Sequence, residues 1–187
     1  LGMLDDVYQE VEHKMERSIE ALRRDLSRIR TGRASLALLD GIKADYYGTV
    51  TPLDQMATLA VPDSRLITIQ PWDKTQLGTI EKAIQSSDLG LTPTNDGTLI
   101  RLTIPALTAE RRKELVKQVK KIGEESKIAL RNVRRDGNET LKSFEKDKLV
   151  SEDDMRRGQE QVQKITDRFI ADVNDILQTK EHEVMEV

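Results

Sequence analysis

Three long segments of the chain repeat apolar or small residues at alternating steps of three and four, the pattern of a helix with one buried face. They cover residues 4–29, 109–147 and 152–180. Stripes of this length need partners, and they cover one another most simply in an elongated antiparallel three-helix bundle. At about 1.5 Å per residue the second helix is on the order of 60 Å long, so the bundle is expected to be a rod.

Residues at the segment ends support this division. Ser151 is a good N-cap for the third helix, and the three acidic residues 152–154 that follow it suit the positive end of a helix. The link at 148–150 is short, so the second and third helices should be antiparallel neighbours. The buried stripe of the second helix is predicted at Leu115, Val119, Ile122, Ser126, Ala129, Val133, Thr140 and Phe144.

Residues 31–107 follow a different pattern, in which Gly, Pro and Asp-Gly separate short β-prone runs. Strands are predicted at Ile42–Tyr47, Met56–Val61, Leu66–Gln70 and Leu99–Ile104, and a helix at Thr75–Ser86. The fold class is therefore α+β. A bundle of residues 1–30 plus 106–187 carries a small α/β domain, residues 31–105, inserted after the first helix. Two connections between a rod and a compact domain form a natural hinge, which we assign to Thr31, Gly32, Ala34, Pro105 and Ala106.

The net charge of −3 hides a strong asymmetry along the chain. Residues 108–148 hold 13 basic and 8 acidic residues, whereas residues 149–187 hold 5 basic and 10 acidic ones. We interpret the clustered arginines, which we expect to lack neighbouring counter-charges, as contacts for RNA or another polyanion. Aromatic residues make up only 3% of the chain, which favours contacts to phosphates over base stacking. The candidate contacts are Arg134, Arg131, Arg135, Arg112, Arg111, Arg30 and Arg33.

Signals for catalysis, cofactors or metals are weak. The chain has no cysteine and no Walker-type or dinucleotide-binding glycine motif, and no run of about 18 apolar residues could span a membrane. Glu10-x-x-His13 matches half of a di-iron motif, but Thr179 stands where the copy before His182 would need its Glu. We therefore predict no enzyme activity, no cofactor and no metal. Leu1 and Gly2, before Met3, are interpreted as a tag remnant with no signal peptide.

Several motifs together resemble one family, the bacterial ribosome recycling factors. The resemblance covers essentially the whole chain, and its motifs fall in the family order. They are residues 27–34 (SRIRTGRA), 39–41 (LDG), 46–48 (YYG), 81–84 (EKAI), 87–91 (SDLGL), 110–113 (ERRK), 131–136 (RNVRRD) and 151–154 (SEDD).

The resemblance implies a near-L-shaped molecule whose bundle binds ribosomal RNA of the large subunit. With elongation factor G and GTP, such a factor splits post-termination ribosomes into subunits, and it is not itself an enzyme. Arg134 and Arg131 match arginines that the family uses on ribosomal RNA, and Arg30, Arg33 and Arg112 match further basic positions. We expect a cytoplasmic monomer.

One alternative stays open, a helical-bundle adaptor or chaperone that binds protein partners.

One departure from the family pattern is Gly137, where relatives usually carry a better helix former. With Gly123 and Gly158 it predicts weak points in the helices, because glycine in a helix costs about 0.5–1 kcal/mol relative to alanine.

Overall fold

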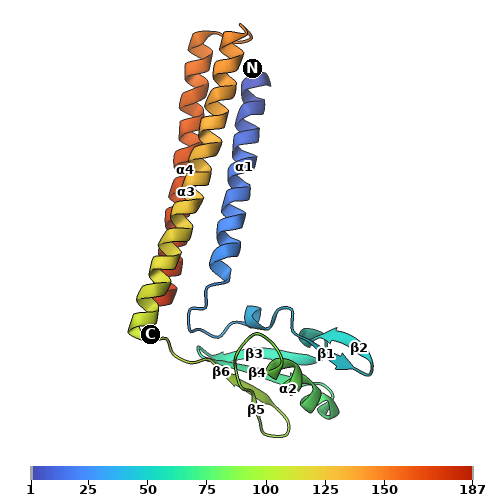
Figure 1. Cartoon of the computed structure of the whole chain (residues 1–187). Helices are drawn as coiled ribbons and strands as arrows, with labels where there is room; N and C mark the ends of the chain where they lie inside the picture. Colours follow the sequence, from blue (N-terminus) through green and yellow to red (C-terminus); the bar gives the residue numbers. More distant parts are fainter. Residues whose placement is uncertain (1, 187) are drawn as a thin grey trace. The chain divides into compact units, whose positions relative to one another are not determined.

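The computed structural model describes residues 2–186, which form two compact units (Figure 1). One unit joins residues 2–30 to residues 109–186, and the other comprises residues 31–108. The second crossing between the units thus lies after Thr108, three residues beyond the end we assigned to the insert. Leu1, interpreted as part of a tag remnant, lies outside the described residues, whereas Gly2 is the first residue of a helix.

The first unit is a bundle of three helices, α1 (Gly2–Ser27), α3 (Ala109–Lys146) and α4 (Glu152–Met185). Each helix packs against both others, and α3 runs antiparallel to α1 and α4 (Figure 1). The three predicted helices are confirmed, with ends that differ by at most five residues. Ser151 caps α4 as predicted, because its Oγ accepts a hydrogen bond of 3.0 Å from the backbone N–H of Asp154.

The buried face of α3 differs from its predicted stripe at Ile122, which is half-buried beside the buried Gly123, and again in the second half of the helix. Thr140 is exposed and Val133 only half-buried, whereas Leu130, Gly137 and Leu141 are buried. The true stripe lies one residue further along because it passes through glycine positions, which a search for apolar side chains does not count. The side chains of α1 and α4 that complete this core are Val7, Val11, Met15, Leu22, Leu26, Val162, Ile165, Phe169, Val173, Leu177 and Val184.

The glycines predicted as weak points are instead places where two helices approach closely. A Cβ atom at Gly137 would lie 2.8 Å from Cγ2 of Val11, and one at Gly158 would lie 3.0 Å from Cδ1 of Leu141. A Cβ at Gly123 would overlap the side chain of Leu177. Helix α3 continues without interruption through both of its glycines. Their low helix propensity is therefore offset by close packing that a larger residue would disturb.

The second unit contains two antiparallel sheets, one α-helix and three short 3₁₀ helices, Leu36–Leu39, Leu53–Gln55 and Lys74–Gln76. Strands β1 (Lys43–Tyr46) and β2 (Thr49–Pro52) form a hairpin, and the larger sheet has the order β3-β4-β6-β5. Its strands are β3 (Ala57–Asp63), β4 (Leu66–Pro71), β5 (Thr94–Asn95) and β6 (Ile100–Thr103). Every strand pair is antiparallel, so the insert that we predicted as α/β contains no parallel βαβ crossover.

Helix α2 (Leu77–Gln85) follows the short 3₁₀ turn Lys74–Gln76, so together they correspond to the predicted helix at 75–86. The four predicted strands are confirmed as β1, β3, β4 and β6. Ile80 and Ile84 of α2 are buried in one cluster with Ile67 and Ile69 of β4. This cluster gives the insert a hydrophobic core of its own.

Candidate nucleic-acid interface

Three of the arginines predicted to contact RNA, Arg131, Arg134 and Arg135, lie together in the middle of α3. Arg131 and Arg135 are exposed, one turn apart on the same face of the helix. Arg134 is half-buried, and its Nη1 donates a 3.4 Å hydrogen bond to Oε1 of Gln163 on α4. Its guanidinium is thereby directed across the seam between the two helices.

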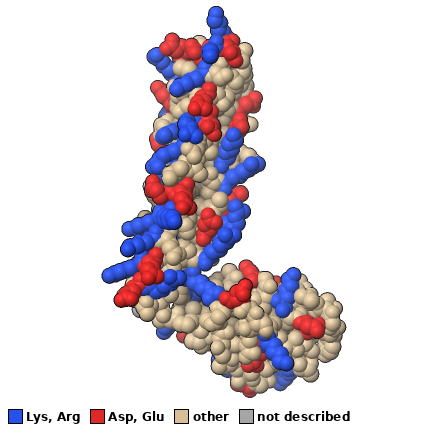
Figure 2. Space-filling view, in the orientation of Figure 1, with Lys and Arg blue, Asp and Glu red and all other residues tan. Residues whose placement is uncertain are grey.

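Arg131 and Arg135 are not free of counter-charges, so the prediction was wrong for these two residues. Nη1 of Arg131 lies 3.5 Å from Oε1 of Glu124, and Nε of Arg135 lies 4.0 Å from Oδ1 of Asp136. Figure 2 likewise shows acidic and basic side chains interspersed along the bundle. All four side chains are 45–65% exposed, so solvent screens these pairs and each contributes little to stability. Such pairs can be replaced by another anion.

A second pair of arginines lies at the start of α3. Nη1 of Arg111 donates to Oε2 of Glu114 at 2.9 Å. Arg112 is half-buried, and its Nε has no hydrogen-bond partner among the described residues. Arg112 and Arg131 are 19 positions apart in the sequence, which corresponds to about 29 Å along the helix. The structure therefore places the predicted α3 arginines in two groups on one rod.

Arg30 and Arg33 belong to different units, the first to the bundle and the second to the insert. Both side chains are exposed.

The two connections between the units lie side by side within the insert. The backbone N–H of Ala34 donates to the carbonyl of Ser64 at 2.7 Å, and that of Ile104 donates to the carbonyl of Arg65 at 2.8 Å. Because Ser64 and Arg65 are neighbours in the β3–β4 turn, one turn holds both crossing segments. Ala34, which we assigned to the hinge, is thus fixed to the insert.

Gly32 is the residue of the hinge assignment with an unusual backbone. Its φ of +77° lies in the left-handed region that favours glycine, and a Cβ there would lie 2.9 Å from Cγ of Leu107. Leu107 was missed because nothing in the sequence shows that it packs against Gly32. Pro105 and Ala106, also assigned to the hinge, are exposed, and Thr31 is half-buried.

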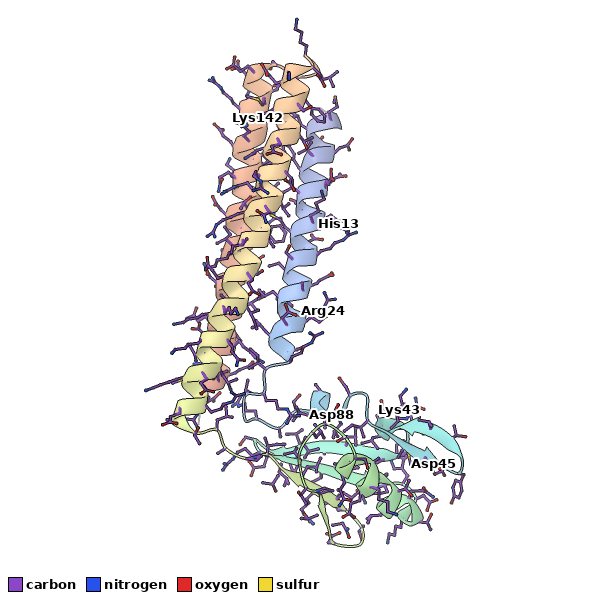
Figure 3. All side chains as sticks on the ribbon, in the orientation of Figure 1. His13, Arg24, Lys43, Asp45, Asp88 and Lys142 are labelled. Carbon is purple, nitrogen blue, oxygen red and sulfur yellow. The ribbon has the colours of Figure 1, made fainter. Side chains whose placement is uncertain are left out.

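Neither a metal centre nor a membrane span is found among residues 2–186. No group of three or more His, Cys, Asp or Glu residues in that range could hold a metal ion. Figure 3 shows His13 on the side of α1 that points away from α3 and α4, and Glu10 pairs with Lys14 at 3.0 Å. No helix within the described part is long and apolar enough to cross a membrane.

Comparison with known proteins gives matches over nearly the whole chain. The family model for the ribosome recycling factor matches residues 22–185. The chain is 58% identical to the ribosome-recycling factor of Oleidesulfovibrio alaskensis over 184 residues, which cover 98% of this chain and all of the relative. It is 55% identical to the factor of Brevibacillus brevis over 185 residues, covering 99% of this chain and all of that relative.

Solved structures agree with these matches. A solution structure of the ribosome recycling factor superposes with a TM-score of 0.77 at 42% identity, with 98% of each chain covered. A second describes the T. thermophilus ribosome recycling factor and the E. coli elongation factor G bound to the E. coli post-termination complex. It matches with a TM-score of 0.64 at 44% identity, covering 98% of this chain and 99% of that one. These matches cover both the three-helix bundle and the inserted antiparallel unit. The chain therefore belongs to the ribosome recycling factor family.

Proposed function

We propose that this protein acts with elongation factor G and GTP to split post-termination ribosomes into subunits that can be reused. The observation that carries the proposal is the match to ribosome recycling factors over at least 98% of the chain at 54–58% identity. A related factor is described on a post-termination complex together with elongation factor G. Both units of this chain are covered by that similarity.

In this proposal the bundle binds ribosomal RNA of the large subunit through the phosphate contacts of α3. Arg134 is the central residue, because it is half-buried and its contact with Gln163 directs a planar donor group that suits phosphate oxygens. Arg131 and Arg135 flank it, Arg111 and Arg112 bind further along the rod, and Arg30 and Arg33 contribute near the crossings between the units.

The segments that join the two units serve as a hinge. Because Ala34 and Ile104 are anchored in the insert, the motion is confined to residues 30–33 and 105–108. Elongation factor G pushes on the insert, and the bundle transmits the load to the contacts between the ribosomal subunits. The factor itself catalyses no reaction, needs no cofactor, and works as a monomer in the cytoplasm.

The first test is binding to isolated large ribosomal subunits, measured by pelleting over a series of salt concentrations. We expect Arg134→Ala to weaken binding by about tenfold or more, because a hydrogen bond between charged groups contributes about 1.5–3 kcal/mol. Arg156→Ala is the matched control. It removes the same charge from an exposed position on α4, where Arg156 pairs with Glu152 at 2.7 Å.

Equal affinity of the wild type and Arg134→Ala, with circular dichroism showing both folded, would refute the role of Arg134. Failure of the wild type to bind at low salt would refute the proposed function and favour an adaptor that binds protein partners. If binding follows the expected order, a subunit-splitting assay with elongation factor G and GTP tests the second half of the proposal.

A further inference from the structure

Helix α3 carries a row of basic residues that is longer than the arginine cluster. At about 100° per residue, seven cations lie within about 40° of Arg131 around the helix axis. They are Lys113, Lys117, Lys120, Lys127, Arg131, Arg135 and Lys142, and we call them the α3 cationic row. The row extends over 30 residues, with about 43 Å of helix between its first and last members, and Lys142 lies towards the α3–α4 turn (Figure 3).

The row is accessible along its length. Six of its side chains are exposed and Lys127 is half-buried. It lies beside the packing face rather than within it, because the buried residues Leu115, Val119 and Leu130 lie about 100–160° away from Arg131 around the helix.

One acidic residue interrupts the row. Between Lys113 and Lys142, Glu124 is the only carboxylate within the same sector, since the other four acidic residues of that stretch lie about 80° or more away. Lys120, Glu124 and Lys127 line one open groove with residues of α4 that include Asn174 and the acidic Glu181. Glu124 therefore places a negative charge at the middle of a surface suited to a polyanion.

Glu124 is also the residue that pairs with Arg131. The two lie two helical turns apart with Oε1 and Nη1 separated by 3.5 Å, and their side chains are 59% and 45% exposed. Because the pair is exposed and longer than an ideal hydrogen bond, it can be replaced by a phosphate at low cost. The Glu124 carboxylate thus lies beside the Arg131 guanidinium, in the position that an RNA phosphate would take.

We propose that Glu124 is a built-in counter-ion that competes with RNA phosphate for Arg131 and so lowers the affinity of the bundle for ribosomal RNA. This inference rests on the proposed function, since it requires that α3 binds RNA. In the complex a phosphate takes the place of the Glu124 carboxylate at Arg131. The weaker binding favours release of the factor once the subunits have separated.

The test compares Glu124→Gln with Glu125→Gln in the same pelleting assay on large ribosomal subunits. The two variants change the net charge equally, but Glu125 lies about 100° further round the helix and outside the row. We expect Glu124→Gln to bind about two- to fivefold more tightly, the range that an exposed ion pair supports. Its plot of log affinity against log salt should steepen by about 0.7–0.9, one additional phosphate contact. Glu125→Gln should change neither value appreciably.

A double-mutant cycle with Arg131→Ala separates this effect from general electrostatics. Once Arg131 is removed, Glu124→Gln should lose most of its gain in affinity, because the carboxylate no longer competes for that guanidinium. The inference is overturned if the wild type binds but Glu124→Gln binds no more tightly. It is also overturned if Glu125→Gln gains as much, or if the gain persists without Arg131. Absence of wild-type binding instead contradicts the proposed function, so the two failures are distinguishable.

Discussion

Gly123→Ala should destabilise the bundle, although alanine is the better helix former. Gly123 is buried in the middle of α3, and a Cβ there would come closer than 3.0 Å to Cγ, Cδ1 and Cδ2 of Leu177 on α4. Leu177 is itself only 9% exposed. No single rotation of one methyl group relieves three contacts, so the helices must separate or Leu177 must adopt a poor rotamer.

The expected magnitude follows from two opposing terms. Replacing a helical glycine by alanine stabilises the helix by about 1 kcal/mol. Forcing an extra methyl group into a packed core costs typically about 1–3 kcal/mol, and the three contacts with Leu177 favour the upper part of that range. We therefore expect the free energy of unfolding of the bundle to fall by about 1–2 kcal/mol.

Urea unfolding, followed by circular dichroism and by tryptophan fluorescence, shows which of the two units has lost stability. Helices α1, α3 and α4 contain 26, 38 and 34 residues and α2 only 9, so the circular dichroism at 222 nm reports mainly on the bundle. Trp72 is the only tryptophan and lies in the insert, so its fluorescence reports on that unit. The control is Gly78→Ala in α2, where a Cβ meets nothing within 4 Å and stability should rise by up to about 1 kcal/mol.

The test is completed in the Leu177→Ala background, where the effect of Gly123→Ala on the free energy of unfolding should change sign. That substitution alone should cost about 2–5 kcal/mol, because it removes a buried leucine. With the leucine side chain gone, Gly123→Ala should become stabilising, since only the propensity term remains. If Gly123→Ala stabilises the wild-type bundle as Gly78→Ala stabilises the insert, the argument that Gly123 is required for close helix packing is refuted.

Three further predictions concern single residues. Gly32→Ala should lower the stability of the insert by about 1–2 kcal/mol in Trp72 fluorescence, because φ is +77° and Leu107 leaves no space for a Cβ. Hydrogen bonds in the β5–β6 loop lower the pKa of Asp96 from 3.8 to about 2, so its stabilising contribution is complete above about pH 4 and lost as the pH falls towards 2. Asp96→Asn should therefore flatten the acid dependence of insert stability between these values in urea titrations. Ser151→Ala should cost about 1 kcal/mol of bundle stability at 222 nm, because it removes the N-cap of α4.

The sequence predicted best those parts of the fold whose apolar pattern repeats over many residues and whose first turn carries a capping residue. The three bundle helices each repeat the helical pattern over more than 20 residues, and Ser151 with its acidic followers marks where α4 begins. The core strands β4 and β6 were also found, because β-branched and aliphatic residues dominate both.

The elements that were missed are short and exposed. Strand β2 has two exposed and two half-buried residues, and β5 has two exposed residues, so neither shows an apolar alternation. The turn into β2 is made by Tyr47 and Gly48, with φ of 50° and 85°, the pattern of a type I′ hairpin. Tyrosine is an uncommon residue at the first of these positions, so the usual Asn-Gly or Asp-Gly signal was absent.

The candidate site was predictable in its residue types but not in its pairing. Arg131, Arg134 and Arg135 are recognisable as a cluster from the sequence alone. That Arg134 reaches Gln163 depends on how α3 packs against α4, which the separate stripes do not determine. The pair of Arg131 with Glu124 was available in principle, because residues seven apart share a helix face. Counting charges over a whole segment concealed it.

The two surfaces of α3 explain why this helix tolerates glycines that a solitary helix would not. Its packing face must allow α1 and α4 to come close, and Gly123 and Gly137 achieve this where a side chain would hold the helices apart. Its cationic row lies to one side, so the long lysine and arginine side chains extend into solvent without entering the seam. The positive charges of the row repel one another, which destabilises the helix. Contacts of α3 with α1 and α4 offset this repulsion more than its own helix propensity does. The contacts with α1 and α4 therefore stabilise a helix whose cationic row extends over about 43 Å.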